Sequence, residues 1–142
     1  MDVKIREFLD SVGSFFTGGD HIPWSDRDII AGCEREVTES GTTETKNEGL
    51  MRLSWALVHS RHSEDVNRGT IHLEARLGGS SSPLQTREKL YLLSVGFYRN
   101  GDYSRSRHLL EQCLKIAPDW RQPQTRKKVV EDQIAKVKIS YF

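Results

Sequence analysis

The stretch that decides the fold is residues 87–120, which reads REKLYLLSVGFYRNGDYSRSRHLLEQCLKIAPDW. Apolar residues recur in it every three or four positions, which is the spacing that places them on one side of an α-helix. Gly101 interrupts this pattern at a turn, and Pro118 ends it. The stretch therefore predicts two antiparallel helices, the first from Leu84 to Asn100 and the second from Tyr103 to Ile116.

The order of large and small residues in this hairpin follows a tetratricopeptide repeat, whose period is about 34 residues. The small side chains of Ser94 and Ser106 allow the two helices to approach closely. The positions that carry the pattern are Leu90, Leu93, Ser94, Phe97, Gly101, Tyr103, Ser106, Leu110 and Pro118.

An earlier part of the chain repeats this pattern when the sequence is shifted against itself so that Leu53 falls on Leu90. The shift predicts a first repeat over residues 47–77 and a second over residues 84–120. The other coinciding pairs are Ala56 with Leu93, Val66 with Tyr103, Gly69 with Ser106, Leu73 with Leu110, and Leu77 with Leu114.

Two hairpins alone leave apolar faces uncovered, because about three repeats are expected for stability. The flanking residues 1–39 and 121–138 carry apolar side chains at helical spacing, so we expect them to cap the pair. Residues 1–16 form an amphipathic arm that should pack on its own domain, and Ser25 or Asp26 caps the helix that follows. We predict a single all-α domain over residues 1–142, a tetratricopeptide-like helical bundle with two central helix-turn-helix repeats and a capping helix on each side.

Charge and composition exclude several classes of protein. The 21 basic and 20 acidic side chains almost cancel, so no large field attracts a phosphate backbone, and we expect no nucleic-acid partner. The first residues lack the uninterrupted apolar run of a secretory signal, and no apolar stretch approaches the roughly 20 residues of a spanning helix. Cys33 and Cys113 lie far apart in helical segments, so both are expected to be reduced and buried in a soluble, cytosolic chain.

No group of residues indicates catalysis, a metal site or a cofactor. The histidines include no i, i+4 pair with a carboxylate partner, and His59 and His62 are expected to be solvated near a helix end. Neither cysteine lies on a loop beside a base, and the glycines form no phosphate-binding loop. We therefore expect a protein that is not an enzyme and that needs no cofactor.

A protein-binding surface is expected on the inner face of the curved repeat array, because the first helix of each repeat exposes side chains there. Such a surface, apolar with basic edges, suits a helical or extended peptide that carries apolar anchors and an acidic group. Ordinary packing beneath the N-terminal arm is the alternative at Tyr91 and Val95. The predicted binding residues are Ser54, Val58, Arg61, Tyr91, Val95, Tyr98, Arg99, Thr125 and Val129.

Four blocks of the sequence carry a more specific resemblance. They are CEREV at 33–37, LMRLSWALVHSR at 50–61, RGTIHLEARL at 68–77 and the stretch at 87–120 quoted above. Together they resemble the tail-anchored mitochondrial and peroxisomal fission protein 1 family, in its plant form, over nearly the whole chain.

The resemblance implies a non-catalytic adaptor on the cytosolic face of the mitochondrial outer membrane and of peroxisomes. Such an adaptor helps to recruit a dynamin-related GTPase, directly or through an intermediary adaptor protein, and self-association stays open. The family normally ends in a membrane-spanning tail, so we expect membrane residence only through an anchor that this sequence lacks. The alternative is a membrane-remodelling or self-assembling structural protein that acts through the amphipathic arm and the basic last helix.

Overall fold

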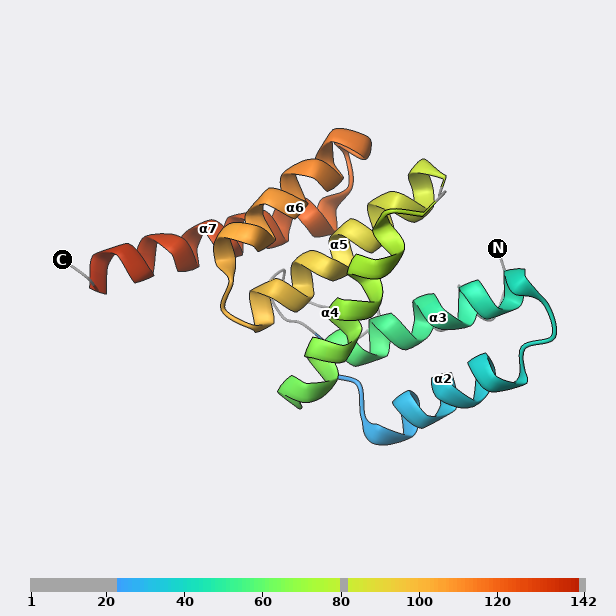
Figure 1. Ribbon diagram of the computed structural model, residues 1–142. Helices are drawn as coiled ribbons and strands as arrows, with labels where there is room; N and C mark the ends of the chain where they lie inside the picture. Colours follow the sequence, from blue (N-terminus) through green and yellow to red (C-terminus); the bar gives the residue numbers. More distant parts are fainter. Residues whose placement is uncertain (1–22, 80–81, 141–142) are drawn as a thin grey trace. The chain divides into compact units, whose positions relative to one another are not determined.

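The chain folds into α-helices, as the periodicity predicts (Figure 1). The computed structural model describes residues 23–79 and 82–140. Within them lie six helices and no strand, apart from an isolated parallel bridge between Ser25 and Ser60. The predicted arm at residues 1–16 lies outside the described residues. The helices are α2 (Arg27–Glu39), α3 (Thr43–Val58), α4 (Ser63–Leu77), α5 (Pro83–Arg99), α6 (Tyr103–Ile116) and α7 (Arg121–Ser140).

Two compact units make up the chain, and the boundary between them falls inside α4. The first unit ends at Gly69 and the second begins at Thr70. The first contains α2, α3 and the beginning of α4, and the second contains the remainder of α4 with α5, α6 and α7. That the two form a single domain stays a prediction.

Polar side chains fix where the helices begin. Asp26 caps α2, since its carboxylate accepts a hydrogen bond from the Ile29 amide at 2.8 Å. Thr42 and Thr45 form a reciprocal capping box that starts α3 at Thr43. The predicted start at Asn47 is therefore too late, because the first turn of α3 is polar and carries no apolar periodicity.

The turn between α5 and α6 forms where glycine and aspartate were expected to place it. Gly101 has a φ of +81°, a left-handed conformation that glycine adopts without steric cost. Asp102 then caps α6 by accepting a hydrogen bond from the Arg105 amide at 3.3 Å. The observed α6 has the bounds that the sequence predicts.

In the first unit, a glycine marks the point where α4 crosses α3. A Cβ atom added at Gly69 would lie 2.9 Å from the Leu57 Cβ and 3.0 Å from the Val58 Cγ1. Contacts this short leave no room for a methyl group, so the close packing of the two helices requires glycine at this position.

The second unit has an equivalent crossing between α5 and α6. Ser94 and Ser106 are both fully buried, and the Ser106 hydroxyl donates a hydrogen bond to the Ser94 carbonyl oxygen at 2.8 Å. The shift that relates the two repeats places Leu57 on Ser94 and Gly69 on Ser106. Both hairpins therefore cross at the same position of the repeat, with a small residue on the second helix each time.

In the second unit, α6 packs against α5 and against α7 (Figure 1). The shared core includes Leu93, Leu110 and Cys113, which are almost completely buried. The side chains of α7 that are buried, Pro123, Arg126 and Val130, all belong to its first half. The second half of α7 therefore projects without cover from α6.

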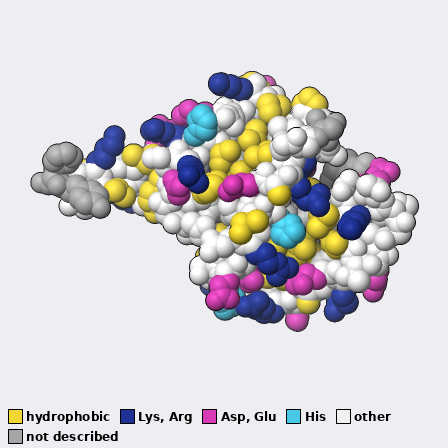
Figure 2. Space-filling view, viewed as in Figure 1, with side chains coloured by type: hydrophobic (Ala, Val, Ile, Leu, Met, Phe, Trp, Pro, Cys, Tyr) yellow, Lys and Arg dark blue, Asp and Glu magenta, His cyan; other side chains and the backbone are white. Residues whose placement is uncertain are grey.

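One face of the molecule shows how its charged side chains are distributed. On the face drawn in Figure 2, basic and acidic side chains alternate with apolar ones, in agreement with the formal net charge of +1. No helix within residues 23–79 and 82–140 combines the length and the apolar character needed to cross a membrane.

Candidate protein-binding surface

Two of the predicted residues of the second unit, Tyr91 and Tyr98, contact one buried arginine of α7. Arg126 is 1% exposed, and its guanidinium carbon lies 5.4 Å from the centroid of the Tyr98 ring. The same guanidinium donates a hydrogen bond to the Tyr91 hydroxyl oxygen. Tyr91 and Tyr98 are two turns apart on α5, so a single side chain from α7 contacts both.

The environment of Tyr91 is mostly apolar despite this contact. Burial raises the pKa of its phenol, and the positive charge and hydrogen bond of Arg126 offset only part of that rise. The phenol therefore stays neutral at physiological pH and keeps its hydroxyl proton.

An aromatic and cationic cluster continues this surface toward the start of α7. The rings of Tyr91 and Trp120 are tilted against each other, with centroids 5.1 Å apart. Arg87, on α5, places its guanidinium 5.0 Å from the centre of the Trp120 ring. Stacking of this kind holds the rings in place, because it combines dispersion with the attraction of a cation to the ring face.

Thr125 and Val129 lie on the same part of α7 as Arg126 and are half-buried. They are one turn apart, so they share a side of the helix. Tyr98 is half-buried too, and its ring packs against Tyr103 at a centroid distance of 5.6 Å. The structure therefore brings Tyr91 and Tyr98 together with α7 through Arg126, while Arg99 is half-buried near the end of α5.

The exposure expected of Ser54 and Val58 is wrong, and Val95, for which packing was the alternative, is buried too. Their side chains are only 2%, 0% and 1% exposed, respectively. The reason is that residues 53–60 are all buried, as are residues 92–96, so these segments of α3 and α5 are covered in every direction around the helix axis. A direct contact between a partner and these three residues stays a prediction.

Arg61 is exposed as predicted, but it stacks on an aromatic ring. Its guanidinium lies 4.7 Å from the centre of the Trp24 ring, which is itself 46% exposed. No sequence pattern pairs these residues, because Trp24 precedes α2 and Arg61 follows α3 in the chain. The first unit thus presents an arginine and a tryptophan together on its surface.

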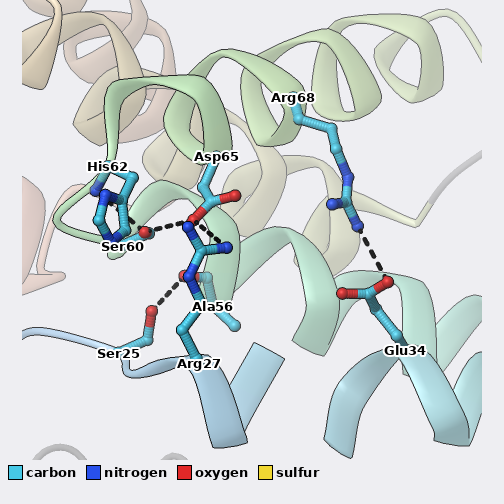
Figure 3. A network of polar contacts seen from close by, with 8 residues as sticks. All are labelled: Ser25, Arg27, Glu34, Ala56, Ser60, His62, Asp65 and Arg68. Atoms are coloured by element: carbon cyan, nitrogen blue, oxygen red, sulfur yellow. Dashed lines mark hydrogen bonds and ion pairs between the residues drawn. The ribbon is translucent and has the colours of Figure 1, made fainter. Parts of the chain in front are cut away.

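A buried polar network fixes the turn that carries Arg61 (Figure 3). The Ser60 hydroxyl donates to the Asp65 carboxylate at 2.6 Å and accepts from the His62 amide at 3.1 Å. Arg27 of α2 lies 3.4 Å from the same Asp65 carboxylate, whose side chain is 9% exposed. A buried carboxylate needs such partners, because leaving it without them would be strongly unfavourable.

The same turn also holds the segment that precedes α2. The Ser25 amide donates to the His59 carbonyl oxygen at 2.9 Å, and the Ser25 hydroxyl donates to the Ala56 carbonyl oxygen. The prediction that His59 is solvated is wrong, because its ring stacks on Trp55 at 4.0 Å and its Nδ1 lies 2.7 Å from the Trp55 carbonyl oxygen. His62 is exposed, as expected.

Neither cysteine is placed to act as a nucleophile. Cys33 and Cys113 are buried free thiols, and burial raises the pKa of each to about 11. A thiol of this kind is almost never ionised near neutral pH and is a poor nucleophile. Among the described residues, histidine, cysteine and carboxylate side chains form no cluster suited to a metal ion.

Comparison with known proteins places the chain in one family. Residues 87–137 match the Fis1 C-terminal tetratricopeptide repeat. The chain is 61% identical to mitochondrial fission 1 protein A of Arabidopsis thaliana over 139 residues. The aligned region covers 96% of this chain and 82% of that relative. The chain belongs to the mitochondrial fission 1 protein family. Mitochondrial fission 1 protein B of Arabidopsis thaliana is 48% identical over 141 residues, spanning 96% of this chain and 84% of that relative.

Solved structures of yeast Fis1 share the fold of this family member. The crystal structure of Fis1 from Saccharomyces cerevisiae matches with a TM-score of 0.72 and 22% identity, over 85% of this chain and 92% of that one. Yeast Fis1 in complex with an Mdv1 fragment matches with a TM-score of 0.69 and 21% identity, over 81% and 91% of the two chains. The predicted family and the predicted all-α, tetratricopeptide-like fold are thus confirmed.

Proposed function

We propose that this chain is a non-catalytic adaptor in mitochondrial and peroxisomal fission, which recruits a dynamin-related GTPase or an intermediary adaptor protein to the organelle surface. Its relatives are named mitochondrial fission proteins, and 61% identity to one of them supports the same process here. The proposed location is the cytosolic face of the mitochondrial outer membrane and of peroxisomes.

The observation that carries the binding role is the Arg126 contact with both tyrosines of α5. Partly exposed aromatic side chains that are already fixed make strong binding anchors, because little conformational entropy is lost when a partner covers them. The proposed contact surface on the second unit consists of Tyr91, Tyr98, Arg99, Thr125 and Val129. On the first unit, Arg61 is a proposed contact.

The partner of yeast Fis1 in the solved complex is an Mdv1 fragment that contains N-terminal extension and coiled coil domains. We extend this by analogy to a helical or extended segment that covers Tyr98 with an apolar side chain and places an acidic group near Arg99. Such a mode uses shape and charge to select the partner and requires no reacting group on this chain.

The test is a double variant, Tyr98→Ala with Arg99→Ala, measured against a purified dynamin-related GTPase alone and together with an adaptor. Anchors of these types that a partner buries often contribute about 2 kcal/mol or more each, so the affinity for the partner should fall by at least roughly thirtyfold. A matched control, Lys115→Ala with Ile116→Ala, removes a cation and an exposed apolar side chain of α6.

Normal capture by the control and weakened capture by a folded Tyr98 and Arg99 variant would support the surface. Equal capture by the parent and both variants would place the contact elsewhere on the chain. Hydrolysis of a nucleotide or ester by the chain alone would contradict the adaptor role itself.

A further inference from the structure

A serine-proline pair lies at the connection between α4 and α5. The sequence contains four prolines, and Ser82 is the only serine or threonine that directly precedes one. This pair is the minimal recognition sequence of proline-directed protein kinases, which transfer a phosphate to the hydroxyl of a serine or threonine followed by proline. The sequence therefore distinguishes Ser82 from every other hydroxyl-bearing residue of the chain.

The structure leaves the Ser82 side chain accessible. Residues 82–85 are all exposed, and Leu84 among them is 51% exposed. The backbone of Ser82 has a φ of −66° and a ψ of 159°, which is the extended conformation that a following proline favours. Its hydroxyl oxygen accepts a hydrogen bond from the Gln85 amide at 3.2 Å, but no residue in the described part of the chain accepts the hydroxyl proton. The proton that phosphoryl transfer removes is therefore not held by the fold.

A kinase binds its substrate as an extended segment, so the first turn of α5 has to open during the reaction. This turn is held to Ser82 by the Thr86 amide, which donates to the Ser82 carbonyl oxygen at 2.9 Å, and by reciprocal hydrogen bonds with Gln85. No side chain from 82 to 85 is buried, so the opening exposes little additional apolar surface. A helix end with so little buried surface opens at a low cost in free energy.

The charges around the connection favour a phosphate once it has been added. The first amides of α5 carry the partial positive charge of a helix N-terminus. Two turns further along α5, the Lys89 ammonium donates a hydrogen bond to the Arg76 carbonyl oxygen at the end of α4, at 3.4 Å. Burial and, to a smaller extent, the positive charge of Arg76 lower the pKa of Lys89, so two cations lie close together beside this connection.

We propose that Ser82 is a phosphorylation site for a proline-directed protein kinase and that its phosphate stabilises the start of α5. The γ-phosphoryl group of ATP forms a bond to the Ser82 Oγ atom while its bond to ADP breaks, and the catalytic aspartate of the kinase takes the hydroxyl proton. The phosphate oxygens then replace the hydroxyl as acceptors for the amides of the first turn. This modification does not depend on the proposed adaptor role.

The test is incubation of the full chain with ATP, Mg²⁺ and either a mitogen-activated or a cyclin-dependent protein kinase, followed by mass spectrometry that locates the phosphate. We expect a single phosphate, on Ser82. Pro83→Ala keeps the hydroxyl and removes the recognition signal, so incorporation should fall to background. The phosphorylated parent should melt about 2–5 °C above the unmodified chain, and high salt should reduce this difference.

Thr42 provides a matched control, because it is exposed and caps α3 with the same reciprocal hydrogen bonds, but Thr43 follows it in place of proline. Thr42 should stay unmodified in the parent and become a second site in Thr43→Pro, since a helix accepts proline at its first position.

The proposal is overturned if neither kinase modifies the chain while both modify a short Ser-Pro peptide. Modification of Pro83→Ala at the rate of the parent, or of Thr42 without the added proline, would overturn it as well, as would a Thr42 that stays unmodified in Thr43→Pro. A phosphorylated chain that melts at or below the temperature of the unmodified chain would overturn the stabilising role of the phosphate.

Discussion

Replacing Gly69 with alanine tests whether the crossing of α3 and α4 is set by glycine. The new Cβ would lie 2.9 Å from the Leu57 Cβ and 3.2 Å from the Val58 backbone nitrogen. The backbone atom cannot rotate away, so the two helices must move apart. Overpacking of this kind typically costs about 1–3 kcal/mol, and the better helix propensity of alanine returns about 1 kcal/mol. We expect a net loss of about 1 kcal/mol in the free energy of unfolding.

Gly32 in α2 provides a matched control for the same substitution. A Cβ there would meet only the Arg35 Nη2 atom, at 3.9 Å, which is ordinary van der Waals contact with the end of a flexible side chain. Only the propensity gain remains, so Gly32→Ala should stabilise the chain by up to about 1 kcal/mol. The free energies of unfolding of the two alanine variants should therefore differ by about 2 kcal/mol, with the parent between them.

Urea denaturation followed by circular dichroism and tryptophan fluorescence measures both variants. Trp24 and Trp55 report on the first unit, where both glycines lie. If Gly69→Ala were as stable as Gly32→Ala, the helices would not be held together at that point, and the assignment of Gly69 as the small residue of the first repeat would fail.

Three further changes have expected outcomes. Ser94→Phe should lower the unfolding free energy by about 1–3 kcal/mol through overpacking against α6, as measured by thermal melts. Burial raises the pKa of Cys33 and Cys113 from 9.0 to about 11, so between these pH values the folded state keeps thiol protons that the unfolded state has lost. The free energy of unfolding, measured in urea, should therefore fall as the pH rises from about 9 to about 11. A flat profile would contradict the burial of the two thiols. Ser60→Ala should cost about 1–3 kcal/mol, because Asp65 loses a buried donor, and an unchanged urea midpoint would remove that network from the stability of the fold.

The helices and their crossing points could be predicted because each depends on residues close together in the sequence. Gly101 and Asp102 form a turn through their own backbone and side-chain preferences, so the bounds of α6 follow from local chemistry. Ser94 and Ser106 belong to one repeat pattern, and their close approach follows from their size. The correspondence between the two repeats was predictable as well, since Gly69 falls on Ser106 when their sequences are aligned.

The exposed side of the first repeat helices could not be predicted in the same way. Helical spacing shows which residues share a side, but it does not show how many neighbours surround a helix. Val58 and Val95 were assigned to an open face by spacing alone. In the structure they lie in runs of buried residues that extend around the whole helix, so both apolar side chains belong to the core.

The partners of the charged residues were the hardest to foresee, because they come from segments far apart in the chain. Arg126 belongs to a basic run that is typical of a solvated helix face, yet it is buried against Tyr91 and Tyr98 of another helix. Arg61 was assigned to the binding surface, and its guanidinium also covers the ring of Trp24. In both cases an aromatic ring from a distant part of the chain offers a surface on which a guanidinium can be partly desolvated.

The sequence predicts that α7 caps the repeats and adds Thr125 and Val129 to the proposed binding surface, and the structure gives it a further role in holding that surface. Tyr91 and Tyr98 lie on α5, but the one group that contacts both lies on α7. Removal of α7 would therefore take away this shared contact and leave Tyr98 with its packing against Tyr103 of α6. An isolated second repeat would then keep its hairpin and lose the fixed orientation of its anchors. Affinity for a partner should therefore depend on α7 more strongly than the folding of the repeat does, because the orientation of the rings depends on Arg126 and the hairpin depends on Ser94 and Ser106.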